Sequence, residues 1–463
     1  MDREEHDSLG AIVVPHDRYW GAQTARALVN FPSGGDTFPP PLVHALGRIK
    51  RVAAITNATL GVLPEPLAGL IARAAAEVAD GELDDHVVVP VWQSGSGTQL
   101  NMNVNEVIAG RANELAGRGR GGREPVHPND HVNRSQSSND VIPTALHVAA
   151  ALEVRDWLLP ALDSLEDALG ERAAAFGDVV KTGRTHLMDA LPVSLGRELD
   201  AWAQLVAIGR RRVAGAMDEL LVVPLGGTAV GTGVGAPPDF ARRAVANLAA
   251  DTGLALRDAA NPLVHQAAHP APLALSGALR DLAGNLRKIA DDVRLLASGP
   301  RCGLGELVLP ANEPGSSAMP GKVNPTQAES LVMICKQVMA CDLACGLAAA
   351  AGHLELNTCR PLLACNLLHS IRLLAEGAGS FATRCVAGLE VDRARITATL
   401  ERSLMLATVL VPRLGYDRTA ELVRTAQDSG VSLREAVVAD GALSGEEFDQ
   451  LMRQAWPRTG PVA

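Results

Sequence analysis

Apolar residues recur through the middle of the chain at alternating spacings of three and four, a pattern typical of long helices that pack against one another. One such seam runs over 275–296, and a second runs over 195–220. Further helices are predicted over 42–79 with a break near 61–66, and over 152–175, 329–350 and 363–381. Because strand patterns are scarce and no alternation of strands with helices is visible, the sequence predicts an all-α fold with a central bundle of long helices.

The two ends of the chain differ from this middle part. Residues 1–40 contain clusters of proline and glycine and are expected to be irregular. After Ser403 the apolar segments are shorter and are separated by Gly415, Gly430 and Gly441, which predicts a small domain of short helices. We therefore expect three domains, namely an N-terminal domain over 1–136, a central helical bundle over 137–393 and a small C-terminal domain over 394–463.

Polar loops interrupt the apolar pattern, and the segment 312–329 is the most unusual of them. Three prolines and two glycines prevent regular structure there, yet long predicted helices lie on both sides. The segment also contains Ser316, Ser317, Lys322 and Asn324, which place one cation among several neutral hydrogen-bond donors. Such a combination suits an anion whose charge grows during a reaction. An ordinary turn between two helices is the alternative.

Two other polar stretches are placed where they could support a binding site. Serine, asparagine and aspartate over 135–140 stand directly before an apolar run that begins at Val141, and they predict a helix N-cap. The free backbone N–H groups of such a terminus can bind a carboxylate. Asparagines at 101, 103 and 105 are poor helix formers, so their density indicates a buried polar network.

Composition and charge limit the classes of partner. Hydrophobic residues make up 47% of the chain and aromatic residues only 3%, so the core must be aliphatic. The net charge of −10 argues against nucleic acid or an anionic membrane as the main partner. An acidic protein that binds an acidic metabolite must do so through a local site.

Cysteine usage and the N-terminal sequence indicate a cytoplasmic location. Seven scattered cysteines, an odd number, do not form a disulfide framework. Cys341 and Cys345 are one helical turn apart and could share a metal, but no second ligand pair has zinc spacing, so buried thiols are favoured. The first residues are acidic with no apolar run behind them, so we expect no signal peptide, and no apolar stretch is expected to span a membrane.

Two of the polar clusters allow a chemical interpretation beside a structural one. The glycines over 226–235 could cradle a phosphate, but the run lacks the Gly-Lys-Ser/Thr ending and follows a helix, so close backbone packing is favoured. His127, Asp130 and His131 could bind a divalent metal, whereas the proline among them favours an anion-binding turn.

A single histidine is usually structural, but the setting of His186 is unusual. It lies between Thr185 and a polar loop at a predicted helix start, where an imidazole could transfer a proton at neutral pH. Glu329 could orient the ring. Ser316, His186 and Glu329 could alternatively form a serine hydrolase triad, but the sequence over 94–97 lacks the Gly-x-Ser-x-Gly elbow, which makes that hypothesis the weaker one.

Taken together, the polar loops resemble those of a known family. The sequence Gly315-Ser-Ser-Ala-Met-Pro-Gly-Lys-Val-Asn-Pro325 matches the specific signature Gly-Ser-Ser-x-Met-Pro-x-Lys-x-Asn-Pro of the fumarase/aspartase superfamily. The similarity covers essentially the whole chain, from the segment 18–24 to the segment 414–417 and beyond. Ser-Gly-Thr at 96–98, Ser-Ser-Asn at 137–139 and Gly-Lys at 321–322 resemble class II fumarases rather than aspartases.

This resemblance implies a three-domain fumarase/aspartase-like fold, assembled as a homotetramer around a 20-helix core with active sites shared between chains. It also implies reversible hydration of fumarate to L-malate, with no cofactor and no metal. Ser316 would be the general base, and His186 with Glu329 would assist loss of the hydroxyl group. The residues that would hold the dicarboxylate are Ser96, Gly97, Thr98, Ser137, Ser138, Asn139, Thr185, Ser317, Lys322, Val323 and Asn324. Those of a second, non-catalytic dicarboxylate site would be His127, Pro128, Asn129 and Asp130.

The chain departs from the class II fumarase pattern in two regions. Val-Pro-Arg-Leu-Gly-Tyr stands at 411–416 where the family usually has Asn-x-His-Ile-Gly-Tyr, and Cys359 and Cys365 stand where an aromatic residue and a histidine are expected. Alternative functions are therefore considered. One is aspartate ammonia-lyase, or another lyase acting on C4 succinyl compounds. Another, from a different class, is a non-catalytic helical bundle that serves as a binding or scaffold protein.

Overall fold

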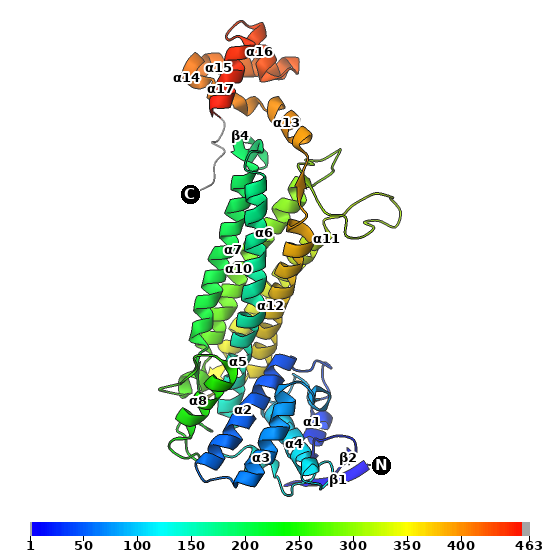
Figure 1. Ribbon diagram of the computed structural model, residues 1–463, viewed down its shortest axis with the longest axis vertical. Coiled ribbons are helices and arrows are strands. Elements are labelled where there is room, and N and C mark those ends of the chain that lie inside the picture. The colour runs from blue at the N-terminus through cyan, green and yellow to red at the C-terminus, as the bar shows by residue number, and fades with distance from the viewer. Residues whose placement is uncertain (1, 456–463) are drawn as a thin grey trace. The chain divides into compact units, whose positions relative to one another are not determined.

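The computed structural model describes residues 2–455, and helices dominate them (Figure 1). The chain folds into two compact units, each of which combines separate stretches of sequence. Unit 1 comprises Met1–Pro160, Gly209–Ala283 and Ile334–Glu376, and unit 2 comprises Ala161–Ile208, Gly284–Met333 and Gly377–Ala463. The division into three consecutive domains, 1–136, 137–393 and 394–463, stays a prediction.

The long helices confirm the apolar seams of the sequence. They are α6 (Leu159–Ala175), α7 (Leu195–Glu219), α10 (Pro270–Leu296), α11 (Thr326–Ala349) and α12 (Arg360–Phe381), and each boundary between the units falls within one of them. Every seam residue between Leu275 and Leu296 is at most 5% exposed, and Trp202 of the other seam is buried. The core is therefore helical and aliphatic, as predicted.

Unit 1 also contains further helices, of which α2, α3 and α4 lie side by side (Figure 1). Gly47 of α2 allows the first two to approach closely, because a Cβ added there would lie 2.5 Å from the backbone nitrogen of Ala79. Helices α2 and α3 confirm the predicted helical stretch and its break. The elements of unit 1 are β1 (Asp2–Asp7), β2 (Gly10–Pro15), α1 (Ala22–Asn30), α2 (Pro40–Thr59), α3 (Glu65–Ala79), α4 (Thr98–Leu115), α5 (Ser138–Glu153), β5 (Val222–Val223), α8 (Phe240–Thr252), β6 (Arg257–Asp258), α9 (Leu263–Ala267), β8 (Gly352–His353) and β9 (Leu356–Asn357).

The prediction that residues 1–40 are irregular is wrong. Strands β1 and β2 form an antiparallel hairpin, and α1 follows it. Strand β1 consists almost entirely of charged residues, so it carries none of the apolar alternation by which a strand is recognised in a sequence. The guanidinium group of Arg3 donates to the backbone carbonyls of Arg18 and Trp20, each at 2.6 Å, and so ties the hairpin to the segment before α1.

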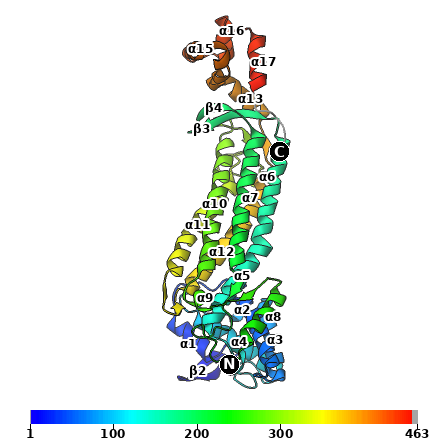
Figure 2. The same ribbon diagram turned by 90° about the vertical axis from the view of Figure 1, so that its left-hand side faces the viewer.

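Unit 2 carries an antiparallel hairpin of β3 (Val180–Thr185) and β4 (Met188–Ser194) between α6 and α7 (Figure 2). Strand β7 (Leu307–Val308) pairs with β10 (Glu390–Val391). The short C-terminal helices separated by glycines are confirmed, since Gly415 and Gly430 bound α15 with φ of +83° and +67°. These helices are α13 (Arg393–Arg402), α14 (Val411–Leu414), α15 (Tyr416–Ser429), α16 (Leu433–Ala439) and α17 (Gly445–Ala455).

By length and composition alone, helix α11 is long and apolar enough to cross a membrane. The expectation that no apolar stretch reaches this length is therefore wrong. Helix α11 is the single helix of this kind among residues 2–455. The central helices of soluble bundles have the same properties, because they pack against neighbours on several faces. On α11 the side chains of Leu343 and Leu347 are each 67% exposed, so this helix presents an apolar face that the chain itself leaves uncovered.

Candidate functional site

Four hydroxyl groups of unit 1 form a chain of hydrogen bonds at the starts of α4 and α5. The Oγ of Ser96 lies 3.0 Å from the Oγ of Ser94 and 2.8 Å from the Oγ1 of Thr98. The Thr98 Oγ1 in turn lies 2.9 Å from the Oγ of Ser138. Because a hydroxyl can donate or accept, this chain can turn its protons toward a carboxylate oxygen. Three of the predicted substrate-binding residues are therefore brought together.

Glycines shape the turn that carries Ser96. Gly97, the residue before α4, has a φ of +76°, in the left-handed region that favours glycine. Gly95 accepts a hydrogen bond at its carbonyl from the Arg360 N–H at 3.0 Å. The backbone approach is so close that a Cβ added at Gly95 would lie 1.4 Å from the carbonyl oxygen of Thr358. The start of α12 therefore fixes the position of the turn.

We expect Gly95→Ala to lower the free energy of unfolding by about 3 kcal/mol, because the added methyl group forces two backbone segments apart. Urea unfolding followed by circular dichroism measures the change. Gly69→Ala in α3 is the matched control, since a Cβ there meets no atom within 4 Å. Equal stability of the two variants would show that the close approach at Gly95 does not hold the turn.

The helix N-cap predicted over 135–140 is confirmed. The Ser137 side chain caps α5 by accepting from the Asn139 N–H at 3.2 Å, and the Ser137 N–H donates to the Asp140 Oδ1 at 2.9 Å. This reciprocal arrangement is a capping box. It holds Ser137, Ser138 and Asn139, all predicted substrate-binding residues, at the positive end of the α5 dipole.

Asp140 also joins this turn to the glycine run that follows α7. Its Oδ2 accepts from the N–H groups of Gly226 and Thr228 at 2.9 and 3.0 Å. Burial raises the pKa of the Asp140 carboxyl, and these backbone donors oppose the shift. Close backbone packing of the run is confirmed, because a Cβ added at Gly226 would lie 2.5 Å from the Ala241 Cβ. The sequence analysis placed Asp140 in the predicted cap but did not foresee its contacts with Gly226 and Thr228, which are distant in the sequence.

The buried polar network indicated by the asparagines of α4 is confirmed. The Nδ2 groups of Asn101 and Asn105 both donate to the Oδ1 of Asn133 at 3.2 Å. Asn103 accepts from the Val88 N–H at 2.9 Å. All three asparagines of α4 are buried. Asn101 and Asn105 therefore hold the segment before α5, whereas Asn103 holds the backbone near Val88.

The predicted second site, His127 to Asp130, is a tight turn. The N–H groups of Asn129 and Asp130 both donate to the Nδ1 of His127 at 3.1 Å, and Pro128 begins a single π-helical turn over Pro128–Val132. Burial lowers the pKa of the His127 imidazole, which favours the neutral ring that accepts at Nδ1. The His127 ring thus occupies both of these backbone donors, and binding of a dicarboxylate at the turn stays a prediction.

Metal binding finds no support in the part of the chain that the structure describes. Within residues 2–455, no three His, Cys, Asp or Glu side chains are grouped so as to hold a metal ion. Cys341 and Cys345 are buried free thiols, as the sequence analysis favoured. Burial raises the pKa of the Cys345 thiol to about 12, so it stays protonated.

In unit 2, Thr185 and His186 lie at the tip of the β3–β4 hairpin. The prediction that His186 stands at a helix start is therefore wrong, because α7 begins only at Leu195. His186 and Leu187 are the central residues of the turn, with φ of +56° and +62°. Such turns usually contain asparagine and glycine, and other residues are strained by about 1–3 kcal/mol each. Strain of this kind, held at an exposed hairpin tip, is typical of functional positions.

A buried ion network anchors this hairpin. Glu306 is 1% exposed, and it accepts from the Arg184 Nη2 at 2.6 Å and forms an ion pair with the Lys181 Nζ at 3.3 Å. Lys181 also pairs with Glu198 of α7 at 3.2 Å. Arg184 directly precedes Thr185, so Glu306 fixes the strand that presents the two candidate residues. The sequence contained no signal for this network, because its members are far apart along the chain.

We expect Glu306→Gln to lower the free energy of unfolding by about 3–5 kcal/mol, because it leaves the buried Lys181 and the partly buried Arg184 without their shared carboxylate. Thermal and urea unfolding measure the loss. As the control, Asp178→Asn breaks the exposed ion pair between Asp178 and Arg393 and should cost about 0–1 kcal/mol. Similar losses in both variants would mean that Glu306 does not anchor the hairpin.

The segment 312–325 is a loop that projects away from the helices of unit 2 (Figure 1). Ser316 Oγ accepts hydrogen bonds from the N–H groups of Ala318 and Met319 at 3.2 and 3.0 Å. Gly315 approaches the returning strand of the loop closely, since an added Cβ would lie 2.0 Å from the Lys322 carbonyl oxygen. The two backbone donors point partially positive hydrogens at the Ser316 oxygen, which stabilises negative charge on that oxygen.

The other loop residues are exposed within the single chain. Ser317, Lys322 and Val323 face solvent, and the Asn324 side chain donates to the Gly315 carbonyl. Glu329 in the first turn of α11 is exposed and lies 3.9 Å from Arg294. Between the described residues His186 and Glu329 the chain forms no hydrogen bond or ion pair, so one chain does not provide the predicted orientation of His186 by Glu329.

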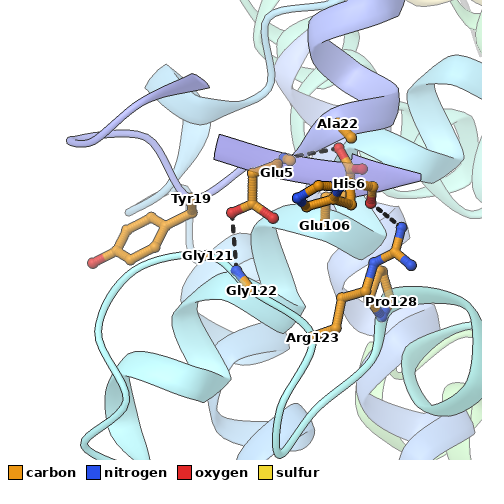
Figure 3. A pocket seen from close by; sticks show the side chains of 10 residues that line it. Glu5, His6, Tyr19, Ala22, Glu106, Gly121, Gly122, Arg123 and Pro128 are labelled. Atoms are coloured by element: carbon orange, nitrogen blue, oxygen red, sulfur yellow. Dashed lines mark hydrogen bonds between the residues drawn. The ribbon is translucent and has the colours of Figure 1, made fainter. Parts of the chain in front are cut away.

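A small pocket in unit 1 does not coincide with the candidate site (Figure 3). Glu5 and Glu106 line it, and Glu106 accepts from the N–H groups of Gly21, Gln23 and Thr24 at 2.8–3.0 Å. Its volume is about 10 Å³, which is room for about one water molecule. It is too small for a dicarboxylate, and Glu106 serves to cap α1.

The candidate residues thus form two groups. Unit 1 brings together Ser96, Thr98, Ser137, Ser138 and Asn139 at two helix starts. Unit 2 carries the hairpin tip with Thr185 and His186 and the loop with Ser316 to Asn324. The first group can bind a carboxylate, and the second can supply a proton acceptor, a proton donor and a cation.

Comparison with known proteins gives these two groups a context. Residues 10–340 match the lyase family model, and residues 406–455 match the model of the fumarase C C-terminus. The chain is 53% identical to the class II fumarate hydratase of Pseudomonas syringae pv. tomato, over 98% of each chain. It is also 53% identical to that of Thermosynechococcus vestitus, over 97% of each. A crystal structure of class II fumarase from Schistosoma mansoni superposes with a TM-score of 0.94 at 43% identity, covering 99% of this chain and 100% of the other.

Proposed function

This chain belongs to the lyase family that includes the class II fumarate hydratases, and on that premise we propose that it catalyses the reversible hydration of fumarate to L-malate. The observation that carries the proposal is the environment of Ser316. Two backbone N–H groups donate to its Oγ within the loop whose sequence matches the family signature. A serine hydroxyl is a poor base unless its surroundings stabilise the alkoxide, and these donors do so.

In the proposed reaction, the Ser316 alkoxide removes a proton from C3 of L-malate. The C–H bonding electrons move into the adjacent carboxylate and form an aci-carboxylate with two negative charges. Lys322 and Asn324 would stabilise this dianion together with backbone N–H groups of the loop. Its collapse forms the C2–C3 double bond and expels the C2 hydroxyl group.

The departing hydroxide needs a proton, and His186 is the proposed proton donor. Its place at an exposed, strained hairpin tip lets the imidazole reach a ligand outside its own hairpin. Glu329 would orient it once both meet in an assembled site. Proton transfer to the leaving group then yields fumarate and water, so the reaction as proposed needs only side chains and backbone groups.

Besides Lys322, neutral donors are assigned to the two carboxylates of the substrate. Ser96, Thr98 and Ser138 would turn their linked hydroxyls toward one of them, and the α5 terminus would add its N–H groups and its dipole. The remaining predicted contacts are Gly97, Ser137, Asn139, Thr185, Ser317 and Val323.

We propose a homotetramer in which each active site takes residues from several chains. Two observations support it. Lys322 is exposed in a single chain although its role requires a site with little water. The exposed Leu343 and Leu347 of α11 are one helical turn apart and suit helix packing against another chain. A 20-helix core would cover them.

Three further assignments belong to this proposal. The turn at His127–Asp130 would be a second, non-catalytic dicarboxylate site. The protein would act in the cytoplasm. The chain would be divided functionally into the segments 1–136, 137–393 and 394–463.

Ultraviolet absorbance of fumarate tests the proposed function. The purified protein is incubated with L-malate and, separately, with L-aspartate. We expect fumarate from L-malate and none from L-aspartate. Fumarate from L-aspartate alone would identify an ammonia-lyase, and none from either substrate would favour a non-catalytic bundle.

A further inference from the structure

Lys50 is a buried cation that the proposed reaction does not use. It lies on α2 and has no exposed surface. Its Nζ donates to the Oδ1 of Asn133 at 3.0 Å. The same oxygen accepts from the Nδ2 groups of Asn101 and Asn105, each at 3.2 Å. Three donors from two helices therefore meet on one side-chain oxygen, and that oxygen belongs to neither helix.

Asn133 lies in the short segment that leads into the candidate site. It follows the turn Pro128–Val132 and precedes the α5 cap at Ser137. Its Nδ2 donates to the Gln136 carbonyl at 3.2 Å, so the side chain holds the last residue before the cap. Any displacement of Asn133 is therefore passed to Ser137 through only a few covalent bonds.

Helix α2 holds the same segment at a second point. Asn57, two turns after Lys50, donates to the Arg134 carbonyl at 2.9 Å and accepts from the Ser135 hydroxyl at 2.8 Å. Ser135 has a φ of +64°, which is strained for a residue with a side chain. A strained backbone persists only when its surroundings fix it, and here α2 supplies those contacts.

We propose that Lys50 is a positioning residue, whose buried ammonium group acts through Asn133 to fix the segment that presents Ser137, Ser138 and Asn139 to the dicarboxylate. This inference rests on the proposed function, because it assigns the segment to substrate binding. Lys50 itself touches no candidate catalytic group. Its effect is on the shape of the carboxylate-binding turn.

The electrostatics agree with this role. Burial lowers the pKa of Lys50 to about 7, and the negative charge of Asp140 opposes that shift. Lys50 in turn lowers the pKa of the Asp140 carboxyl, against the raising effect of burial. In its protonated form, Lys50 thus favours the ionised form of the carboxylate that caps α5. A methionine would fill similar space without burying a charge, so packing alone does not account for a lysine here.

Lys50→Met tests the proposal, with Ile49→Val as its control. Ile49 is the neighbouring residue on α2 and is also fully buried, so its shortening matches a local packing loss without touching Asn133. We expect Lys50→Met to raise the KM for L-malate about tenfold while kcat changes less than about threefold, which is the pattern of lost ground-state binding. Ile49→Val should leave KM unchanged.

A double variant separates action through Asn133 from a general weakening of the fold. If Lys50 acts through Asn133, adding Lys50→Met to Asn133→Ala should change KM by less than about twofold, because the effects of coupled residues do not add. If the KM changes of the two single variants multiply in the double variant, the two residues act independently. This result would overturn the proposed action of Lys50 through Asn133.

Hydrogen exchange of the peptide 133–141 measures how firmly the backbone of this segment is held, and it does not depend on catalysis. We expect faster exchange in this peptide for Lys50→Met than for Ile49→Val. Equal exchange in the two variants, or an unchanged KM for Lys50→Met, would overturn the proposal. If the wild-type protein converts no L-malate, the proposed function fails, and the exchange comparison alone then decides whether Lys50 positions the segment.

Discussion

Ser316→Ala is expected to lower kcat for the dehydration of L-malate by about 10²–10⁴-fold, the usual contribution of a general base. The Ser316 oxygen is the group on which two backbone N–H donors converge, and alanine removes that oxygen. The loop is largely exposed, so the fold should be kept, with the free energy of unfolding unchanged to within about 0.5 kcal/mol.

The absorbance assay and urea unfolding together measure this result. Glu313→Gln is the matched control, because Glu313 is an exposed residue of the same loop with no proposed role. It should retain nearly full activity. If Ser316→Ala kept more than about a tenth of the wild-type rate, another group would have to be the base.

Ser138→Asp is expected to prevent productive binding of the dicarboxylate. Ser138 is the first residue of α5, and its hydroxyl is 2.9 Å from that of Thr98. An aspartate there places a negative charge where the substrate carboxylate is proposed to bind, and such like-charge contacts cost several kcal/mol. We therefore expect kcat/KM to fall by at least about a hundredfold.

Folding should survive this change, because an acidic residue in the first turn of a helix interacts favourably with the helix dipole. Ser138→Ala is the control. Its kcat/KM should fall by about tenfold, which is the effect of losing one hydrogen bond to a charged ligand. Circular dichroism checks the helix content of both variants. Equal kcat/KM for the two would place the substrate away from the α5 terminus.

The long helices were predictable from the sequence because their burial is continuous. Each seam residue of α10 faces the core, so the apolar spacing is unbroken over the whole helix. The hairpin that carries His186 was not predictable in the same way. Its turn residues, histidine and leucine, lack the asparagine and glycine that signal a tight turn. Local sequence preference and observed conformation disagree there, as is common at functional positions.

The candidate site also contains a part that the sequence predicted and a part that it did not. Ser316 and Ser138 lie in polar segments with clear local signals, one a loop rich in proline and glycine and the other a helix cap. The residues that hold those segments were not found in the sequence. Glu306 meets Arg184 and Asp140 meets Gly226 across long separations, and Lys50 meets Asn133 in the same way. Such contacts depend on the tertiary fold, and the spacing of apolar or polar residues along the sequence does not predict them.

In the proposed homotetramer, one active site combines Ser316 of one chain with the α5 terminus of another. Ser316→Ala and Ser138→Asp affect different units, and each should be inactive alone. When the two variants are unfolded, mixed in equal amounts and refolded together, chains assemble at random. About a quarter of the sites then receive both wild-type groups.

The measurement is the rate of fumarate formation from L-malate by this mixture, compared with each variant refolded alone. The account predicts recovery of about a quarter of the wild-type rate. A mixture as inactive as its components would contradict the account, because every site would then draw Ser316 and Ser138 from the same chain.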